Sequence, residues 1–166
     1  MKGQNEITNS ENTIDSRDII DRIEYLENER DSLQKDIDTA QENLDDESAD
    51  ADDNDPERVE QYKVEFAEAK ETMADWQSEY GDELKALTEL ADDASGYSSD
   101  WQDGETLVNE SYWLEYVEQL AEDIGAIDRN AAWPLNHIDW EAAADELMQD
   151  FTEVSFNGTA YYMRNS

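Results

Sequence analysis

Two apolar seams, each spaced to lie on one face of a helix, constrain the fold of this chain most strongly. In the first, apolar residues recur in steps of four and three, and only Arg30 interrupts them. This heptad spacing predicts a helix over residues 16–46, roughly 45 Å long at ~1.5 Å per residue. We expect Ser16 to cap its start. The first seam consists of Ile19, Ile23, Leu26, Leu33, Ile37, Ala40 and Leu44.

The second seam follows a strong signal for the start of a helix. Asp55 is a capping residue, Pro56 suits the first helical position, and Glu57 falls in the first turn. The apolar residues then keep the same spacing as far as residue 90, and only Gly81 weakens the pattern. The second seam consists of Val59, Tyr62, Phe66, Ala69, Met73, Trp76, Tyr80, Leu84, Leu87 and Leu90.

Neither seam would stay exposed to water on its own, so the pair predicts an antiparallel helical hairpin over residues 16–92. The sequence is compatible with pairing of the seams within one chain or between two chains. The acidic run between them, residues 45–55, has little to bury, and we expect a solvated loop. Residues 1–15 are polar without periodicity, and we expect a flexible tail.

Residues 93–166 predict a small α+β unit. Residues 110–124 are amphipathic with Gly125 as a stop signal, and Asp139 begins a shorter amphipathic helix. Asn157-Gly158 between two alternating runs is the preferred sequence of a type I′ β-hairpin. A two-stranded ribbon is marginal alone, so we expect the two helices to cover it. The predicted fold class is therefore mostly α, a long coiled-coil-like hairpin followed by two helices and a C-terminal β-hairpin.

Composition excludes several kinds of chemical site. The chain has no Cys and a single histidine, His137, so neither a thiol nucleophile nor a two-histidine metal site can be built. Asp50, Asp52 and Asn54 alternate like the start of a calcium loop, but the Gly and Glu that such a loop needs at its sixth and twelfth positions are missing. We therefore predict no enzyme activity, no cofactor and no metal site, with only weak cation condensation on the acidic run.

The charge balance decides which partners suit this chain. It carries 46 acidic and 11 basic residues, a formal charge of −35, and folding compresses these like charges. Direct binding to DNA, RNA or an anionic membrane needs a basic patch, which the sequence lacks. No run of ~18 apolar residues and no signal-peptide core is present, so we expect a cytoplasmic protein with a basic protein surface as its partner.

The acidic bias is strongest between Lys85 and Arg129, where twelve acidic residues occur without one lysine or arginine. Glu115, Glu118 and Glu122 stand at i, i+3 and i+7, a single stripe opposite the aromatic side of the predicted helix. Neighbouring carboxylates on such a stripe are ~5–6 Å apart, comparable to phosphates along a DNA strand. The candidate partner-binding residues are Glu110, Glu115, Glu118, Glu122, Asp123, Asp145 and Glu146. Trp101 and Trp133, in predicted loops, are candidate aromatic contacts.

Three features of residues 103–164 carry a resemblance to a known family. They are an aromatic-rich helix, the helix start Ile138-Asp139-Trp140, and a closing hairpin that ends in Tyr161-Tyr162-Met163-Arg164. Together they resemble the C-terminal region of acidic antirestriction proteins of phages and mobile elements, of which ArdA is the best-known type. The resemblance implies an elongated, usually dimeric DNA mimic that occupies the DNA-binding channel of type I restriction–modification enzymes. ArdA-type proteins are chains of small mixed domains, whereas residues 16–92 predict a helical hairpin.

We therefore expect a DNA-mimic inhibitor of a host defence enzyme, with a restriction–modification complex as the first target, acting in the host cytoplasm if phage-encoded. An alternative is a salt-adapted acidic scaffold that uses the helical hairpin for interaction and inhibits nothing. A third and weaker alternative is a low-affinity binder of divalent cations. Composition alone does not separate mimicry from salt adaptation.

Overall fold

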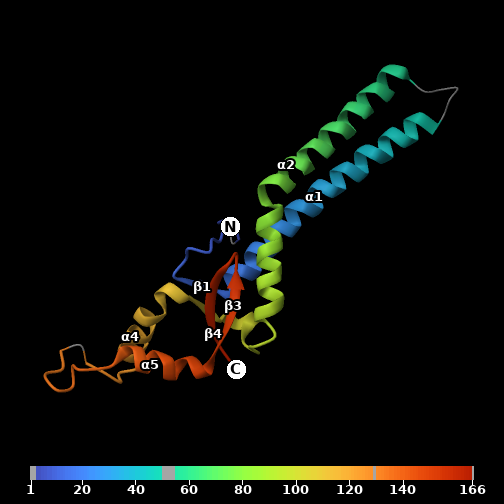
Figure 1. Cartoon of the computed structure of the whole chain (residues 1–166). Helices are drawn as coiled ribbons and strands as arrows, with labels where there is room; N and C mark the ends of the chain where they lie inside the picture. Colours follow the sequence, from blue (N-terminus) through green and yellow to red (C-terminus); the bar gives the residue numbers. More distant parts are fainter. Residues whose placement is uncertain (1–2, 50–54, 129, 166) are drawn as a thin grey trace. The chain divides into compact units, whose positions relative to one another are not determined.

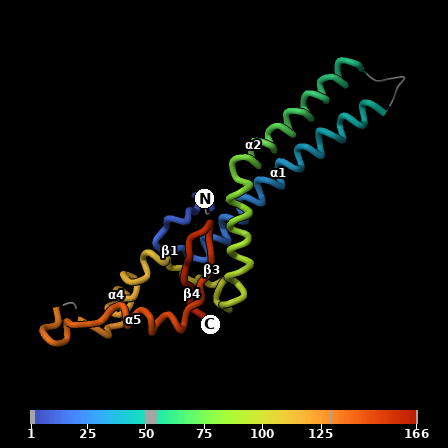
Figure 2. The backbone as a smooth tube through the Cα atoms, viewed as in Figure 1, coloured from blue at the N-terminus to red at the C-terminus, as the bar shows by residue number. Residues whose placement is uncertain are grey.

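The computed structural model describes residues 3–49, 55–128 and 130–165, and the chain forms two compact units (Figures 1 and 2). The first, here called the sheet unit, combines Met1–Arg22 with Ala86–Ser166. The second, here called the hairpin unit, is Ile23–Lys85. The sequence interpretation placed the boundary after residue 92 instead, because the helical periodicity runs past residue 86 without a break.

Two long helices account for the mostly α fold class, as predicted. They are α1 (Ser16–Ala49) and α2 (Pro56–Ala94), and they pack together as an antiparallel hairpin (Figure 1). The core of the hairpin unit is formed by Leu26, Trp76 and Leu84. Closer to the connection most seam residues are only half-buried, because a pair of helices covers its seam from one side. These half-buried residues include Ile37, Leu44, Val59 and Phe66.

Helix α1 begins differently from the prediction. Ser16 does not cap it, because its hydroxyl is fully buried and donates a hydrogen bond to the carbonyl of Trp101 at 2.6 Å. The same hydroxyl accepts the backbone N–H of Glu105 at 2.7 Å. The cap is Asp15, whose Oδ1 accepts the backbone N–H of Arg17 at 2.9 Å. The side chain that the local sequence predicts as the cap therefore makes a tertiary contact instead.

Helix α1 also extends three residues beyond its predicted end, to Ala49, so the start of the predicted loop is helical. The Gln41 side chain supports this last part by donating to Oδ1 of Asp45 at 2.7 Å, one helical turn on. The calcium-like residues of the acidic run, 50–54, lie outside the described residues. Helix α2 starts as predicted, because Oδ1 of Asp55 accepts the backbone N–H of Glu57 at 3.0 Å.

The sheet unit contains a four-stranded antiparallel sheet rather than a two-stranded ribbon. Its strands are β1 (Thr13–Asp15), β2 (Thr106–Asn109), β3 (Phe151–Phe156) and β4 (Thr159–Arg164), in the order β1-β2-β4-β3. The predicted hairpin of β3 and β4 is confirmed. Asn157 and Gly158 both have positive φ, 48° and 80°, as a type I′ turn requires.

The prediction of a flexible tail over residues 1–15 is wrong for residues 9–15, which directly precede α1. Ile14 is 4% exposed within β1, opposite Leu107 of β2. The Asn109 side-chain amide donates to the carbonyls of Asn9 and Glu11, and the Tyr161 hydroxyl donates to the same Glu11 carbonyl at 2.9 Å. The segment belongs to the sheet unit. Sequence periodicity could not reveal this, because a strand of three residues with one apolar side chain forms no pattern.

Short helices complete the sheet unit. They are α3 (Trp101–Gly104), the 3₁₀ helix η1 (Glu110–Tyr112), α4 (Trp113–Asp123), α5 (Trp140–Leu147) and the 3₁₀ helix η2 (Met148–Asp150). One face of the sheet packs on α4 and α5 through a core of Val108, Trp113, Val117 and Ala144.

The opposite face of the sheet is also buried. Side chains alternate between the two faces along each strand, and the strand pairing places six buried residues on this face: Ile14, Leu107, Val154, Phe156, Tyr161 and Met163. Ile19 of α1 and Leu87 and Leu90 of α2 are buried in the same unit, and we infer that these turns cover this face. No helix among the described residues is apolar enough over sufficient length to cross a bilayer.

Candidate functional site

Helix α4 carries the predicted acidic stripe, and aromatic packing fixes its inner face. The Trp113 ring lies edge-on to Phe151 at 4.8 Å and to Tyr162 at 5.3 Å between centroids, and it stacks on Tyr116 at 5.6 Å. Such pairs contribute roughly 0.5–1.5 kcal/mol each beyond the area they bury. With Val117 also buried one turn on, α4 cannot rotate about its axis without breaking this core.

Both ends of α4 are closed by local hydrogen bonds. Before it, the Oδ1 atom of Asn109 accepts the backbone N–H of Ser111 at 3.0 Å and so caps η1. After it, the backbone N–H of Gly125 donates to Glu122 and that of Ala126 to Ala121, both at 2.9 Å. With φ of +72° at Gly125, this is a Schellman motif, and the predicted stop is confirmed. The helix is defined at both ends as well as along its inner face.

The outer face of α4 presents the three glutamates of the stripe. Glu115 is exposed, and Glu118 and Glu122 are half-buried, on the side away from Trp113 and Val117. At ~1.5 Å per residue, Glu115 and Glu122 are about 10.5 Å apart along the axis. The Gln119 amide donates to Oε1 of Glu115 at 3.4 Å. The stripe is thus a short row of carboxylates on a well-packed helix.

The other candidate residues surround this row or lie on the neighbouring helix. Glu110 is exposed in η1 immediately before α4, and Asp123 is exposed as the last residue of α4. Asp145 and Glu146 are exposed on α5, which packs against α4 in the shared core. Asp139 caps α5 as predicted, since its Oδ1 accepts the N–H of Ala142 at 3.0 Å.

Basic side chains are scarce around these carboxylates. In the described part of 86–165, Arg164 at the end of β4 is the single lysine or arginine. Arg164 acts electrostatically on Tyr116, where burial raises the pKa of the phenol and the guanidinium partly opposes that rise. The helices α4 and α5 themselves contain no lysine or arginine, so all of their charged side chains are acidic.

The two tryptophans proposed as contacts have different environments. Trp101 is 4% exposed in α3, so its role as a surface contact is wrong, and it anchors the fold instead. Trp133 is 75% exposed in the long connection between α4 and α5. Ile124, the last residue of the predicted amphipathic helix, is 70% exposed because α4 ends one residue before it. His137 in the same connection is exposed.

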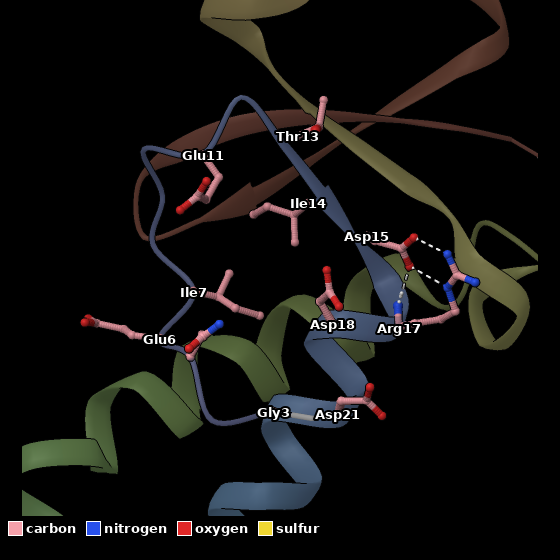
Figure 3. Close-up of a pocket in the computed structure, with 11 residues that line it drawn as sticks. Gly3, Glu6, Ile7, Glu11, Thr13, Ile14, Asp15, Arg17, Asp18 and Asp21 are labelled. Atoms are coloured by element: carbon pink, nitrogen blue, oxygen red, sulfur yellow. Dashed lines mark hydrogen bonds and ion pairs between the residues drawn. The ribbon is translucent and has the colours of Figure 1, made fainter. Parts of the chain in front are cut away.

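A second acidic surface, which sequence reasoning missed, lies beside β1 and the start of α1 (Figure 3). It is a pocket of about 550 Å³ whose lining includes five carboxylates. These belong to Glu6, Glu11, Asp15, Asp18 and Asp21. Arg17 donates to both oxygens of Asp15, at 2.9 and 2.6 Å, and this pair lowers the pKa of Asp15. Among the described residues, no acidic or histidine side chains are grouped to hold a metal ion.

Comparison of the chain with protein-family models, with curated proteins and with solved structures gave no match. The functional argument therefore rests on the geometry and charge described above.

Proposed function

We propose that this protein is a DNA mimic that inhibits a host defence enzyme by occupying its basic DNA-binding channel. The target class is a restriction–modification complex of type I. The observation that carries the proposal is the row of Glu115, Glu118 and Glu122 on the outer face of a helix whose inner face is held by an aromatic core.

The geometry of the row suits a surface that binds phosphates. Its three carboxylates extend over about 10.5 Å of helix axis. Three phosphate steps along one DNA strand cover a similar length, at ~3.4 Å of axial rise per phosphate. Enzymes contact phosphates through lysine, arginine and backbone N–H groups without reading sequence, so a row of carboxylates of similar length can engage the same groups.

The charge of the chain favours binding from a distance. A net charge of −35 attracts a positively lined channel over many ångströms, which raises the association rate and makes binding sensitive to salt. Helices α4 and α5 contain no lysine or arginine, so they contribute only negative charge to this surface. Trp133, exposed in the neighbouring connection, supplies an aromatic contact at the edge of such an interface.

The proposal is tested by competition with DNA. The protein is titrated into a type I restriction–modification complex bound to a labelled duplex, and DNA binding and cleavage are measured at low and at raised ionic strength. We expect release of the duplex and loss of cleavage, both weaker as salt rises. A protein that fails to compete at low ionic strength is not a mimic for this enzyme class.

A pair of matched variants separates geometry from total charge. The first variant changes Glu115, Glu118 and Glu122 to Gln. The control removes the same charge from three exposed glutamates of the hairpin unit, by Glu24→Gln, Glu42→Gln and Glu71→Gln. If each stripe carboxylate contributes ~0.5 kcal/mol, the first variant weakens inhibition about tenfold. Equal inhibition by both variants would show that the row has no special role.

A further inference from the structure

The hairpin unit contains a buried polar atom without a partner. Trp76 is 7% exposed, and within the described part of the chain its indole Nε1 has no hydrogen-bond acceptor. Buried donors are nearly always paired in folded proteins, so an unpaired one calls for an explanation. The explanation must lie in the immediate surroundings of Trp76.

Those surroundings form a groove between α1 and α2 with a volume of about 600 Å³, lined in part by Trp76. Its apolar wall includes the Leu33 side chain and the rings of Tyr25, Trp76 and Tyr80, of which the last two are 6.0 Å apart between centroids. A volume of this size is in the range of ligand-binding clefts and accommodates several large side chains. The groove exists because two helices alone leave part of their shared seam uncovered.

Carboxylates surround the apolar wall of this groove. Glu29, Asp75 and Glu79 line it, and the Tyr25 hydroxyl donates to Oε1 of Glu29 at 2.7 Å, which restrains that carboxylate. A ligand that fills the groove must therefore bring an apolar surface with positive charge on either side.

We propose that this groove binds a basic amphipathic helix of a partner protein. An apolar side chain of that helix packs against Leu33 and Tyr80. The Trp76 ring, whose N–H is enclosed in the free protein, turns so that this N–H donates to an uncharged oxygen of a hydroxyl or an amide of the helix. Lysines or arginines beside the apolar face pair with Glu29, Asp75 and Glu79. Recognition of an amphipathic helix by an apolar groove is a recurring mode of protein binding.

Charge argues against a second copy of this chain as the occupant. The segment Ile23–Lys85 contains 23 acidic and six basic residues, so two hairpin units in contact would place like charges together. The inference goes beyond the proposed function and does not depend on it, because the acidic row of α4 belongs to the sheet unit.

The test uses the full-length protein labelled with ¹⁵N and a synthetic probe peptide. The probe is a helix of about six turns with leucines on one face and lysines beside them. The control peptide has the same composition in scrambled order and lacks a continuous apolar face. The five tryptophans give separate indole N–H signals, and Trp76→Phe identifies the one from Trp76.

We expect the probe to shift the Trp76 indole signal downfield, as a newly formed hydrogen bond does, and to leave that of Trp133 unchanged. The scrambled peptide should shift neither. Ser32→Arg puts a bulky cation into the groove and should weaken binding of the probe about tenfold or more. The matched control Ser78→Arg is exposed on α2 away from the residues that line the groove, and should change binding less than about twofold.

Three outcomes would overturn the proposal. One is an equal shift with the scrambled peptide, which would mean that charge alone drives binding. Another is equal binding by the Ser32→Arg and Ser78→Arg proteins. The third is a Trp76 shift that depends on protein concentration without peptide and accompanies a dimer in sedimentation, which would assign the groove to a second copy.

Discussion

Replacing Asn109 by alanine tests whether the N-terminal segment belongs to the sheet unit. The Asn109 side chain is buried, and its amide donates to the carbonyls of Asn9 and Glu11 at 3.3 and 3.2 Å. Its Oδ1 accepts the backbone N–H of Ser111 at 3.0 Å, just before the acidic helix. The amide also donates to the Tyr161 hydroxyl at 3.3 Å, and Oδ1 also accepts the Ser111 hydroxyl at 2.9 Å. Alanine removes all five bonds and supplies no replacement.

The expected loss follows from what each group then lacks. Loss of the cap on the Ser111 N–H costs roughly 1 kcal/mol. The carbonyl of Asn9 loses the Asn109 amide as its donor, whereas the carbonyl of Glu11 keeps the Tyr161 hydroxyl at 2.9 Å. Loss of the two hydrogen bonds from the Asn109 amide to these carbonyls therefore costs roughly 1–3 kcal/mol. These three bonds alone contribute about 2–4 kcal/mol, a large part of the ~5–15 kcal/mol by which a typical domain is stable.

Urea unfolding followed by tryptophan fluorescence measures this loss, and hydrogen exchange of the β1 amides locates it. The matched control is Asn12→Ala, because Asn12 is exposed in the same segment and should cost less than ~0.5 kcal/mol. If Asn109→Ala is as stable as this control and the β1 amides exchange at the same rate, the segment is not part of the fold and our reasoning is refuted.

Three further predictions concern the hairpin unit, the aromatic core and the charge. Gly81→Ala should stabilise α2 by about 0.5–1 kcal/mol in thermal melts, because the new Cβ meets only the flexible end of the Gln77 side chain; a lower melting temperature would contradict this. Burial raises the pKa values of Tyr116, Tyr161 and Tyr162 above the ~10 at which tyrosines of the unfolded chain ionise. The free energy of unfolding should therefore fall as the pH rises from ~10 through the pKa values of the folded state. Equal urea midpoints at about pH 9 and 11 would contradict this prediction. A DNA mimic should remain folded at about 20 mM salt, whereas a salt-adapted scaffold should lose helicity there, and circular dichroism distinguishes the two.

The helical hairpin could be predicted from sequence because its signal is long and regular. Seven apolar positions from Ile19 to Leu44 repeat one spacing, and the second seam repeats it again. The same holds for the β-hairpin, where Asn157-Gly158 imposes a turn whose φ values only a few residue types adopt. Local chemistry determines both elements, so the sequence alone was sufficient.

The other half of the sheet depends on contacts between distant residues. Strands β1 and β2 contain three and four residues, too few to show alternation. Ser16 illustrates the same limit, since its hydroxyl contacts Trp101 and Glu105, which are far along the chain, and leaves the cap to Asp15. Where a tertiary hydrogen bond competes with a local one, propensity favours the wrong residue.

The candidate sites show the same difference between features set by local sequence and features set by tertiary packing. The row of Glu115, Glu118 and Glu122 was predictable, because helix geometry fixes which residues share a face. The groove at Trp76 was not, because spacing places this tryptophan in the seam but does not tell whether its N–H finds an acceptor there. The shape of a cavity depends on how side chains from two helices pack against each other, and this packing cannot be read from composition or spacing.

The placement of cations connects the fold to the proposed function. In the hairpin unit, basic side chains pair with neighbouring acids, as Arg30 does with Asp31 at 2.9 Å and Lys63 with Glu60 at 3.3 Å. Helices α4 and α5 contain no lysine or arginine of their own, and the packing of Trp113 holds α4 and its repelling carboxylates in place. Under the proposed function, the aromatic core that folds the sheet unit has a second role, because it also keeps the carboxylates of α4 at the fixed spacing that mimicry requires.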